Sequence, residues 1–240
     1  MISIADIIRL SWQTYISKFK KYLPLLGLIF LFSLVGSVAT YYLLDILKLP
    51  QIWGLVASAG ISAIVYLLTF SITILLILYT DQFLQNKKAE FHCKDVLEVF
   101  LPALLLSILV GLITAGGFLL LIIPGVLFTV WYAFTVYIAI LEKKKGLILL
   151  SESRELSRGK FWPVFGRLIL PNLFWGLISY FVLAGIFNII GLIVNKAVVN
   201  QTELGFGVNV GLLAVSALVA SFFAPLYVIV TTIVFREVKK

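Results

Sequence analysis

The sequence predicts an all-α fold, a polytopic membrane helix bundle with about six transmembrane helices. Of its 240 residues, 62% are hydrophobic and 12% are charged, whereas a soluble domain is roughly half apolar and about a quarter charged. The apolar residues gather into six runs, and most of these are as long as the ~20 residues that cross a bilayer core about 30 Å thick. The basic residues gather in alternate connections, which is typical of a membrane protein with one cytoplasmic face.

Six runs without a charged side chain mark the expected spans. A charged residue at the centre of a span costs roughly 2.5 to 3.5 kcal/mol on the insertion scale, so runs that lack one insert most readily. The expected spans are Leu23–Leu44, Gly54–Thr80, Phe100–Ile122, Val126–Leu141, Leu168–Val194 and Gly205–Phe235. With short connections they fill nearly the whole chain, so we expect one integral membrane domain over residues 1–240.

The third and fourth spans are separated only by Pro124 and Gly125. Proline and glycine together mark turns, so the pair is interpreted as the tip of a helical hairpin at the far membrane interface. A single long buried segment, or a re-entrant arrangement, is the alternative interpretation.

The distribution of lysine and arginine predicts the orientation of the chain. All but two of the 19 basic residues lie in the amino-terminal segment, the second and fourth connections and the carboxy-terminal tail. The opposite side has only Lys48 and Lys196, which Asp45 and Glu203 offset. The positive-inside rule therefore places both termini, and the formal net charge of +8, on the cytoplasmic side.

A helix on the membrane surface is expected before the first span, over residues 3–21. Its large apolar residues recur at spacings of three and four, which puts them on one helical face: Ile4, Ile7, Ile8, Trp12, Tyr15 and Phe19. Residues 90–100 and 146–158 suit the same role before the third and fifth spans. Residues 10–24 and 150–163 are also alike locally, and internal duplication and shared interfacial chemistry both remain open as explanations.

An ordered set of motifs between residues 122 and 162 resembles a known family. Ile-Ile-Pro-Gly-Val-Leu at 122–127 leads to Trp-Tyr at 131–132, and a Ser-rich segment at 150–158 leads to Gly-Lys-Phe-Trp at 159–162. The order resembles the prokaryotic family of uncharacterised six-helix membrane proteins related to the membrane domain of glycerophosphoryl diester phosphodiesterases. The resemblance implies a multi-pass protein in the cell membrane of a bacterium or archaeon. It implies no enzymatic activity, because the phosphodiesterase activity of fused relatives belongs to a separate soluble domain.

The six runs show no catalytic chemistry. Hydrolysis within a membrane needs a nucleophile with a base, a carboxylate pair or a metal cluster. His92 and Cys93 are the single histidine and the single cysteine, and they adjoin in a polar loop, whereas structural zinc needs about four such ligands. We therefore expect no enzyme, no catalytic residues, no cofactor or metal site, and no nucleic-acid partner.

Two kinds of intramembrane residue are interpreted as structural. Asn172 and Asn188 are the most polar residues of the fifth span, and interhelical hydrogen bonds explain them better than a transport site does. Pro171 and Pro225 are expected to kink the last two spans, a feature that transporters share. Small residues at spacings of three and four indicate close helix packing in the sixth span: Gly207, Gly211, Ala214, Ala217 and Ser221.

The fourth connection is the candidate binding segment. Gly159 is expected to end a surface helix in a left-handed cap, with Trp162 at the interface and Arg154, Arg158 and Lys160 near lipid phosphates. The favoured hypothesis is a non-catalytic scaffold or accessory subunit whose basic cytoplasmic face binds anionic lipid headgroups or a membrane protein partner. The alternative hypothesis is a permease or exporter component for a lipid-like or amphipathic substrate. A third interpretation is that these charges only set the orientation.

Overall fold

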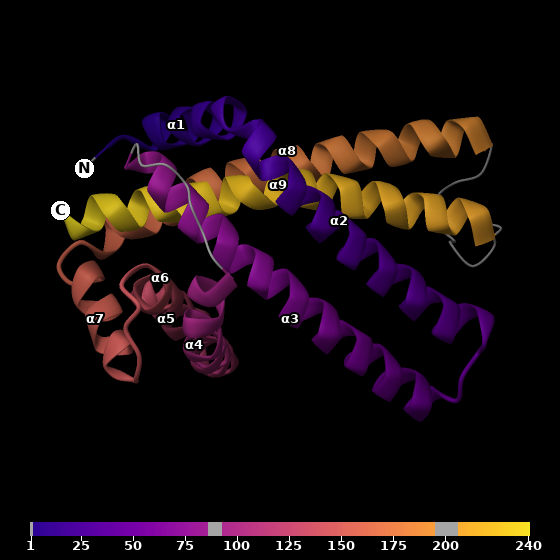
Figure 1. Ribbon diagram of the computed structural model, residues 1–240, viewed down its shortest axis with the longest axis horizontal. Coiled ribbons are helices and arrows are strands. Elements are labelled where there is room, and N and C mark those ends of the chain that lie inside the picture. The colour runs from indigo at the N-terminus through magenta and orange to yellow at the C-terminus, as the bar shows by residue number, and fades with distance from the viewer. Residues whose placement is uncertain (1, 86–92, 195–205) are drawn as a thin grey trace. The chain divides into compact units, whose positions relative to one another are not determined.

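The computed structural model describes residues 2–85, 93–194 and 206–240 and contains only helices among them (Figure 1). Its elements are α1 (Ile4–Ser17), α2 (Phe19–Tyr41), the π-helical turn η1 (Tyr42–Ile46), α3 (Gln51–Leu84), α4 (Cys93–Leu120), α5 (Ile122–Tyr132), α6 (Thr135–Leu141), α7 (Ile148–Ser157), α8 (Phe161–Val194) and α9 (Phe206–Lys239). Six helical segments are long and apolar enough to cross a membrane. The predicted all-α polytopic fold class is confirmed. The interpretations of His92 and of the connection between α8 and α9 lie outside the described residues.

The chain divides into two compact units, each described by itself. The first unit comprises Met1–Phe19, Thr73–Leu173 and Leu226–Lys240, and the second comprises Lys20–Ile72 and Phe174–Pro225. Helices α3, α8 and α9 run from one unit into the other. In α8 and α9 the division falls close to the two prolines of the kink prediction, where the missing proline N–H removes one backbone hydrogen bond.

Helix α1 confirms the expected helix before the first span. Ser3 caps its start, because the Ser3 hydroxyl accepts a hydrogen bond from the backbone N–H of Asp6 at 3.1 Å. The side chains of Ile7 and Tyr15 are buried, and Trp12 is partly exposed at 39%. The helix ends at Ser17, and α2 follows from Phe19. The position of α1 on a membrane stays a prediction.

No separate surface helix precedes the third span within the described residues. Helix α4 begins at Cys93 and continues to Leu120, so the described part of the expected surface helix at 90–100 forms the first turns of α4. The prediction is wrong here because no glycine or proline interrupts the chain between Cys93 and Leu101. Asp95 in the first turn also favours a helix start at this point.

The turn between α4 and α5 lies at Leu121, three residues before the predicted Pro124-Gly125 tip. Leu121 has extended backbone angles, φ −164° and ψ 155°, and α5 begins at the next residue. Pro124 therefore lies in the first turn of α5, where its missing N–H costs nothing. Gly125 permits close approach instead, because a Cβ atom built on Gly117 would lie 3.0 Å from the Gly125 Cα atom.

The helix of the fifth span begins before the predicted span. Helix α8 starts at Phe161 rather than at Leu168, so Arg167 lies within the helix and not in a connection. Its guanidinium Nε donates to the backbone carbonyl of Ile2 at 2.7 Å. The helix thus extends beyond the apolar run, and the membrane boundary at Leu168 stays a prediction.

The core of the first unit joins α6 to the carboxy-terminal end of α9. The rings of Phe134 and Phe235 are both buried, and their centroids are 5.8 Å apart. Beside them, the guanidinium of Arg236 makes a bidentate ion pair with the buried carboxylate of Asp81 on α3. Bidentate geometry is the strongest arrangement for such a pair. Together these contacts tie α3, α6 and α9 into one unit.

In the second unit the expected stripe of small residues is only half correct. Ala217 and Ser221 are buried, and Ala214 is half-buried. Gly207 and Gly211 are exposed, and a Cβ atom built on either meets no described atom within 4 Å. The inward face near the start of α9 is formed by larger residues. Asn209 is one of them, and its side-chain amide donates to the Tyr41 hydroxyl at 2.9 Å.

Candidate functional site

The fourth span is interrupted near its middle, and α7 covers the break. Helix α5 ends at Tyr132 and α6 starts at Thr135. The hydroxyl of Ser153 on α7 donates to the carbonyl of Trp131 at 2.7 Å and accepts from the N–H of Phe134 at 3.2 Å. A backbone break inside an apolar span leaves polar groups that need partners. Ser153 supplies partners to the break on both sides.

A second hydroxyl of α7 extends this contact by one helical turn. Ser157 donates to the carbonyl of Val130 at 3.2 Å. Leu149, Ser153 and Ser157 recur every four residues, and all three side chains are fully buried. Helix α7 is therefore the predicted helix of 146–158, with a buried face that consists of one leucine and two serines. The Ser-rich character that resembled a family motif has a local structural role.

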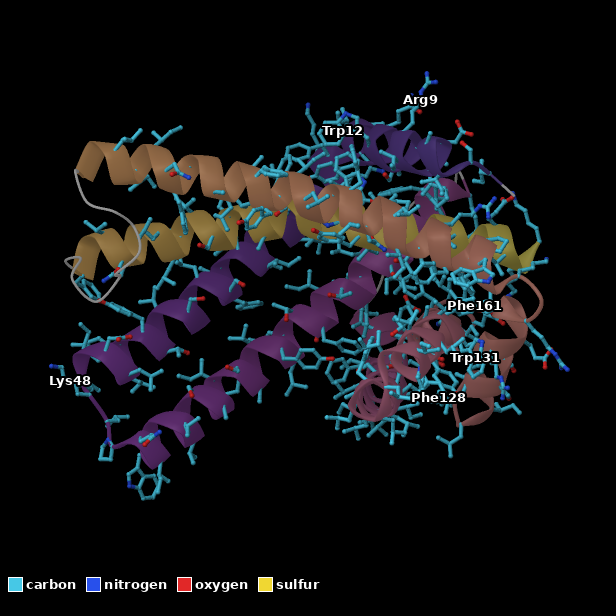
Figure 2. The ribbon with its side chains drawn as sticks, turned by 180° about the vertical axis from the view of Figure 1, so that it is seen from behind. Arg9, Trp12, Lys48, Phe128, Trp131 and Phe161 are labelled. Atoms are coloured by element: carbon cyan, nitrogen blue, oxygen red, sulfur yellow. The ribbon has the colours of Figure 1, made fainter. Side chains whose placement is uncertain are left out.

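Arg154 follows Ser153 and lies against an aromatic ring of the interrupted span. Its guanidinium carbon is 4.4 Å from the centroid of the Trp131 ring. A cation over the face of tryptophan is attracted by the electron density of the ring. Figure 2 shows Trp131 together with Phe128 and Phe161 on this side of the first unit, away from Arg9 and Trp12. The contact fixes the direction of a long cationic side chain.

A cavity of about 530 Å³ opens beside this pair. It is lined by residues of α5 and α7, of the turn that follows α7, and of the start of α8: Leu127, Trp131, Ser151, Arg154, Glu155, Ser157, Arg158, Gly159 and Phe161. One part of the lining is apolar and aromatic, and the other part carries two guanidinium groups and one carboxylate. This combination suits an amphipathic ligand with an anionic head.

The two arginines of the cavity differ in their partners. The Arg158 guanidinium lies 3.0 Å from the Glu155 carboxylate in an exposed ion pair. Arg154 is exposed and makes no ion pair with any acid in the part of the chain that the structure describes. A ligand anion at Arg158 competes with Glu155, whereas an anion at Arg154 has no competing carboxylate. Arg154 is therefore the main cation of the cavity.

The neighbouring lysines of the fourth connection are mostly paired with acids. Lys143 lies 3.0 Å from Asp95 and 3.1 Å from Glu98. Lys144 bridges Glu142 at 3.2 Å and Glu152 at 2.8 Å. Hydrogen bonds to these carboxylates raise the pKa of each lysine above its ordinary value. The net charge of the connection thus overstates the number of cations that are available to a ligand.

Two of the four predicted contact residues line the cavity. Arg154 and Arg158 do so, and Gly159 has the predicted left-handed backbone with φ +71°. Lys160 and Trp162 do not line it, and Trp162 is 75% exposed with its ring edge-on to Phe161. Sequence reasoning missed Trp131, because the α5–α6 break that orients it leaves no glycine or proline signal.

Asn172 and Asn188 are bonded within their own helix. The amide of Asn172 donates to the Leu168 carbonyl and that of Asn188 to the Ala184 carbonyl, each at 2.8 Å. Neither residue lines the cavity beside Arg154. The interpretation of these residues as interhelical hydrogen-bond donors is therefore not the arrangement seen. Each side-chain amide donates to the backbone carbonyl four residues earlier in the same helix.

No protein-family model, curated protein or solved structure matches the chain. The geometry of the Arg154 cavity is accordingly the basis for a functional proposal.

Proposed function

We propose that this chain is a non-catalytic integral membrane protein, a scaffold or accessory subunit, that holds an anionic lipid headgroup through Arg154. One observation carries the proposal. Arg154 lines a cavity of about 530 Å³, lies 4.4 Å from the Trp131 ring centroid, and has no acidic partner within the described residues. A cation held in place beside an open cavity is ready to receive an anion.

The chemistry of the lining supports a phospholipid as the occupant. A guanidinium presents a planar set of donors that matches phosphate oxygens. Leu127, Trp131 and Phe161 offer apolar surface on the same cavity, which suits the glycerol and acyl portion of a lipid. The volume lies within the roughly 300 to 1,000 Å³ that ligand sites occupy. Tryptophan is also a residue of the membrane interface, where headgroups lie.

The proposal includes a cytoplasmic location for the cavity and for both termini, in the cell membrane of a prokaryote. The asymmetry of lysine and arginine supports this orientation. The resemblance of residues 122–162 to the six-helix family supports the cell membrane and gives no reason to propose catalysis.

The experiment is a thermal-shift comparison with two lipids that differ in charge. Purified protein in mild detergent is heated with added phosphatidylglycerol or phosphatidylcholine, for wild type, Arg154→Gln and Arg9→Gln. Arg9 is exposed on α1, so its loss changes the net charge equally at a site away from the cavity. The stabilisation by phosphatidylglycerol should fall in Arg154→Gln and persist in Arg9→Gln. An equal fall in both variants would mean that only total charge matters.

A second candidate function is a permease component, and one cavity of the second unit favours it. This cavity of about 620 Å³ has a lining rich in hydroxyl groups: Ser33, Ser37, Thr40, Tyr41, Ser62, Tyr66 and Thr69. Hydroxyl groups can hydrogen-bond a polar headgroup, and Asp45 is the one charged residue among those that line this cavity. Proteoliposomes with a fluorescent lipid analogue test this candidate, because a permease must move the analogue between leaflets faster than empty vesicles do.

A further inference from the structure

The tip of the helical hairpin formed by α4 and α5 is both apolar and exposed. Five consecutive residues, Leu119 to Ile123, are between 67% and 89% exposed. Every side chain from Ala115 to Phe128 is apolar. Such a continuous apolar surface is unfavourable in water, so an apolar partner must cover it.

The other outer connections of the chain have a different composition. The connection between α2 and α3 contains Asp45 and Lys48, and the sequence between α8 and α9 contains Lys196 and Glu203. Charged residues allow a connection to lie in water. The α4–α5 turn has no charged residue, and it lacks the tryptophan and tyrosine that anchor a chain at the interface. Its composition therefore fits the interior of a bilayer.

The open end of the hairpin, where α4 begins and α6 ends, is charged. Lys143, which follows α6, lies 3.0 Å from Asp95 and 3.1 Å from Glu98 in the first turns of α4. The chain thus enters and leaves the hairpin at the same aqueous face. The ion pairs of the hairpin lie at its open end, whereas exposed apolar side chains run along α4 from Leu97 to the tip.

Two backbone hydrogen bonds link the tip to the helices on either side of it. The N–H of Leu121 donates to the carbonyl of Gly117 at 3.0 Å, and the Leu121 carbonyl accepts from the N–H of Gly125 at 3.3 Å. Pro124 has no N–H, so the start of α5 has one donor fewer to satisfy. A turn in hydrocarbon has no water to replace missing hydrogen bonds, so each of these bonds lowers the cost of burying the tip.

Helices α4 and α5 are also steeply inclined to the carboxy-terminal part of α9 in the same unit. In Figure 1, α4 and α5 are seen nearly along their axes, whereas the carboxy-terminal part of α9 in the same unit lies across the view. Helix α4 has 28 residues and is about 42 Å long at 1.5 Å per residue, enough to cross the bilayer core if it stood upright. The same hairpin at a steep angle to the membrane normal would stop inside the core.

We propose that α4 and α5 form a re-entrant hairpin whose tip, Leu119 to Ile123, ends in the hydrocarbon among lipid acyl chains. The chain then crosses the membrane four times, through α2, α3, α8 and α9. This proposal is linked to the headgroup site at Arg154, because Leu127 and Trp131 of α5 line that cavity and a hairpin that stops inside the core keeps them nearer the cytoplasmic headgroups than a full span would.

Cysteine accessibility tests the proposal. In the Cys93→Ser background, single cysteines are placed at the tip (Leu121→Cys and Leu119→Cys), in the α2–α3 connection (Lys48→Cys) and after α6 (Lys145→Cys). A membrane-impermeant maleimide is added to intact cells, then to opened membranes, then after denaturation in SDS. Lys48→Cys and Lys145→Cys should each react from one face only. The tip cysteines should react at neither face and only after denaturation.

Depth and stability give two further readouts. A fluorophore on Leu121→Cys in proteoliposomes should be quenched more by nitroxides on acyl chains than by nitroxides on headgroups. Ile122→Lys should reduce the yield of inserted protein severalfold, whereas the matched Leu47→Lys in the α2–α3 connection should not. Labelling of either tip cysteine from outside intact cells at the rate of Lys48→Cys would overturn the proposal. A disulfide formed between two copies through Leu121→Cys would also overturn it, because a second chain would then cover the tip.

Discussion

The guanidinium carbon of Arg154 lies 4.4 Å from the centroid of the Trp131 ring, and both residues line one cavity. The two residues come from different helices, α7 and α5, so the contact depends on how α7 covers the interruption of the fourth span. It joins a cation to an aromatic ring at the border between the polar and apolar parts of the lining.

Replacing Trp131 with leucine should weaken lipid retention without preventing insertion. The ring holds the Arg154 guanidinium beside the cavity and forms part of its apolar lining, so loss of the ring should weaken binding of phosphatidylglycerol. The control is Trp162→Leu, because Trp162 is exposed outside the cavity. Native mass spectrometry of both variants measures the retained lipid. If Trp162→Leu loses lipid and Trp131→Leu does not, the lipid site is the turn around Lys160 and Trp162 and not the cavity.

Ser153→Ala should destabilise the first unit. Its hydroxyl is buried and bonds backbone groups on both sides of the α5–α6 break. An unsatisfied buried group costs about 1 to 3 kcal/mol, so the Tm in detergent should fall clearly. Ser151→Ala is the matched control, since the exposed Ser151 hydroxyl bonds only the Ile148 carbonyl of its own helix. Equal Tm values for the two variants would show that the break needs no partner from α7.

The stability of the protein should depend on Glu142 at acidic pH. Burial alone would raise the pKa of Glu142, but hydrogen bonds from Lys239 and Lys144 outweigh burial and hold it below its ordinary value. A carboxylate with a depressed pKa in the folded state stabilises the fold above its unfolded pKa of about 4.3. That contribution is lost as the pH falls through the folded pKa.

The measurement is Tm against pH between about pH 6 and pH 3. Glu142→Gln should be less stable than wild type at pH 6, and the gap between the two curves should close as the pH falls. Parallel curves over this range would show that the contacts of Glu142 with Lys239 and Lys144 do not contribute to stability.

Close helix packing in the second unit should depend on Gly36 rather than on Gly211. A Cβ atom built on Gly36 would lie 2.5 Å from Val65 Cγ2, whereas one built on Gly211 meets nothing within 4 Å. Overpacking typically costs about 1 to 3 kcal/mol, so Gly36→Ala should lower the Tm and Gly211→Ala should leave it nearly unchanged. A larger fall in Tm for Gly211→Ala than for Gly36→Ala would show that the stripe of small residues is a packing face. Its partner would then be a second copy of the chain.

The fold class was predictable from the sequence because the cost of placing charge in a bilayer is large. That cost located the six apolar segments, and helical spacing of apolar residues located α1. The ends of the helices were less predictable. Arg167 continues α8 by bonding a distant carbonyl at Ile2, and no rule based on local charge anticipates such a partner.

The candidate site was predictable only where it depends on local sequence. Arg154, Arg158 and the left-handed Gly159 followed from charge and from the conformational freedom of glycine. The role of Trp131 depends on an interruption of the fourth span that Ser153 stabilises from 19 residues away in sequence. The pairing of Lys143 and Lys144 with acids likewise arises from tertiary contacts. The net charge of the fourth connection could not show which of its basic side chains are available to a ligand.

The most direct test of the account is the affinity of the purified protein for phosphatidylglycerol, measured by native mass spectrometry over a range of salt concentrations. Wild type and the charge-matched control Arg9→Gln should retain the lipid equally, and retention should weaken as salt rises. Arg154→Gln should bind about fivefold more weakly, since a basic residue near an anionic surface is worth about 1 kcal/mol. Arg154→Lys should recover part of the loss. Unchanged retention by a correctly inserted Arg154→Gln would contradict the account and leave the charges of the fourth connection as a signal for orientation alone.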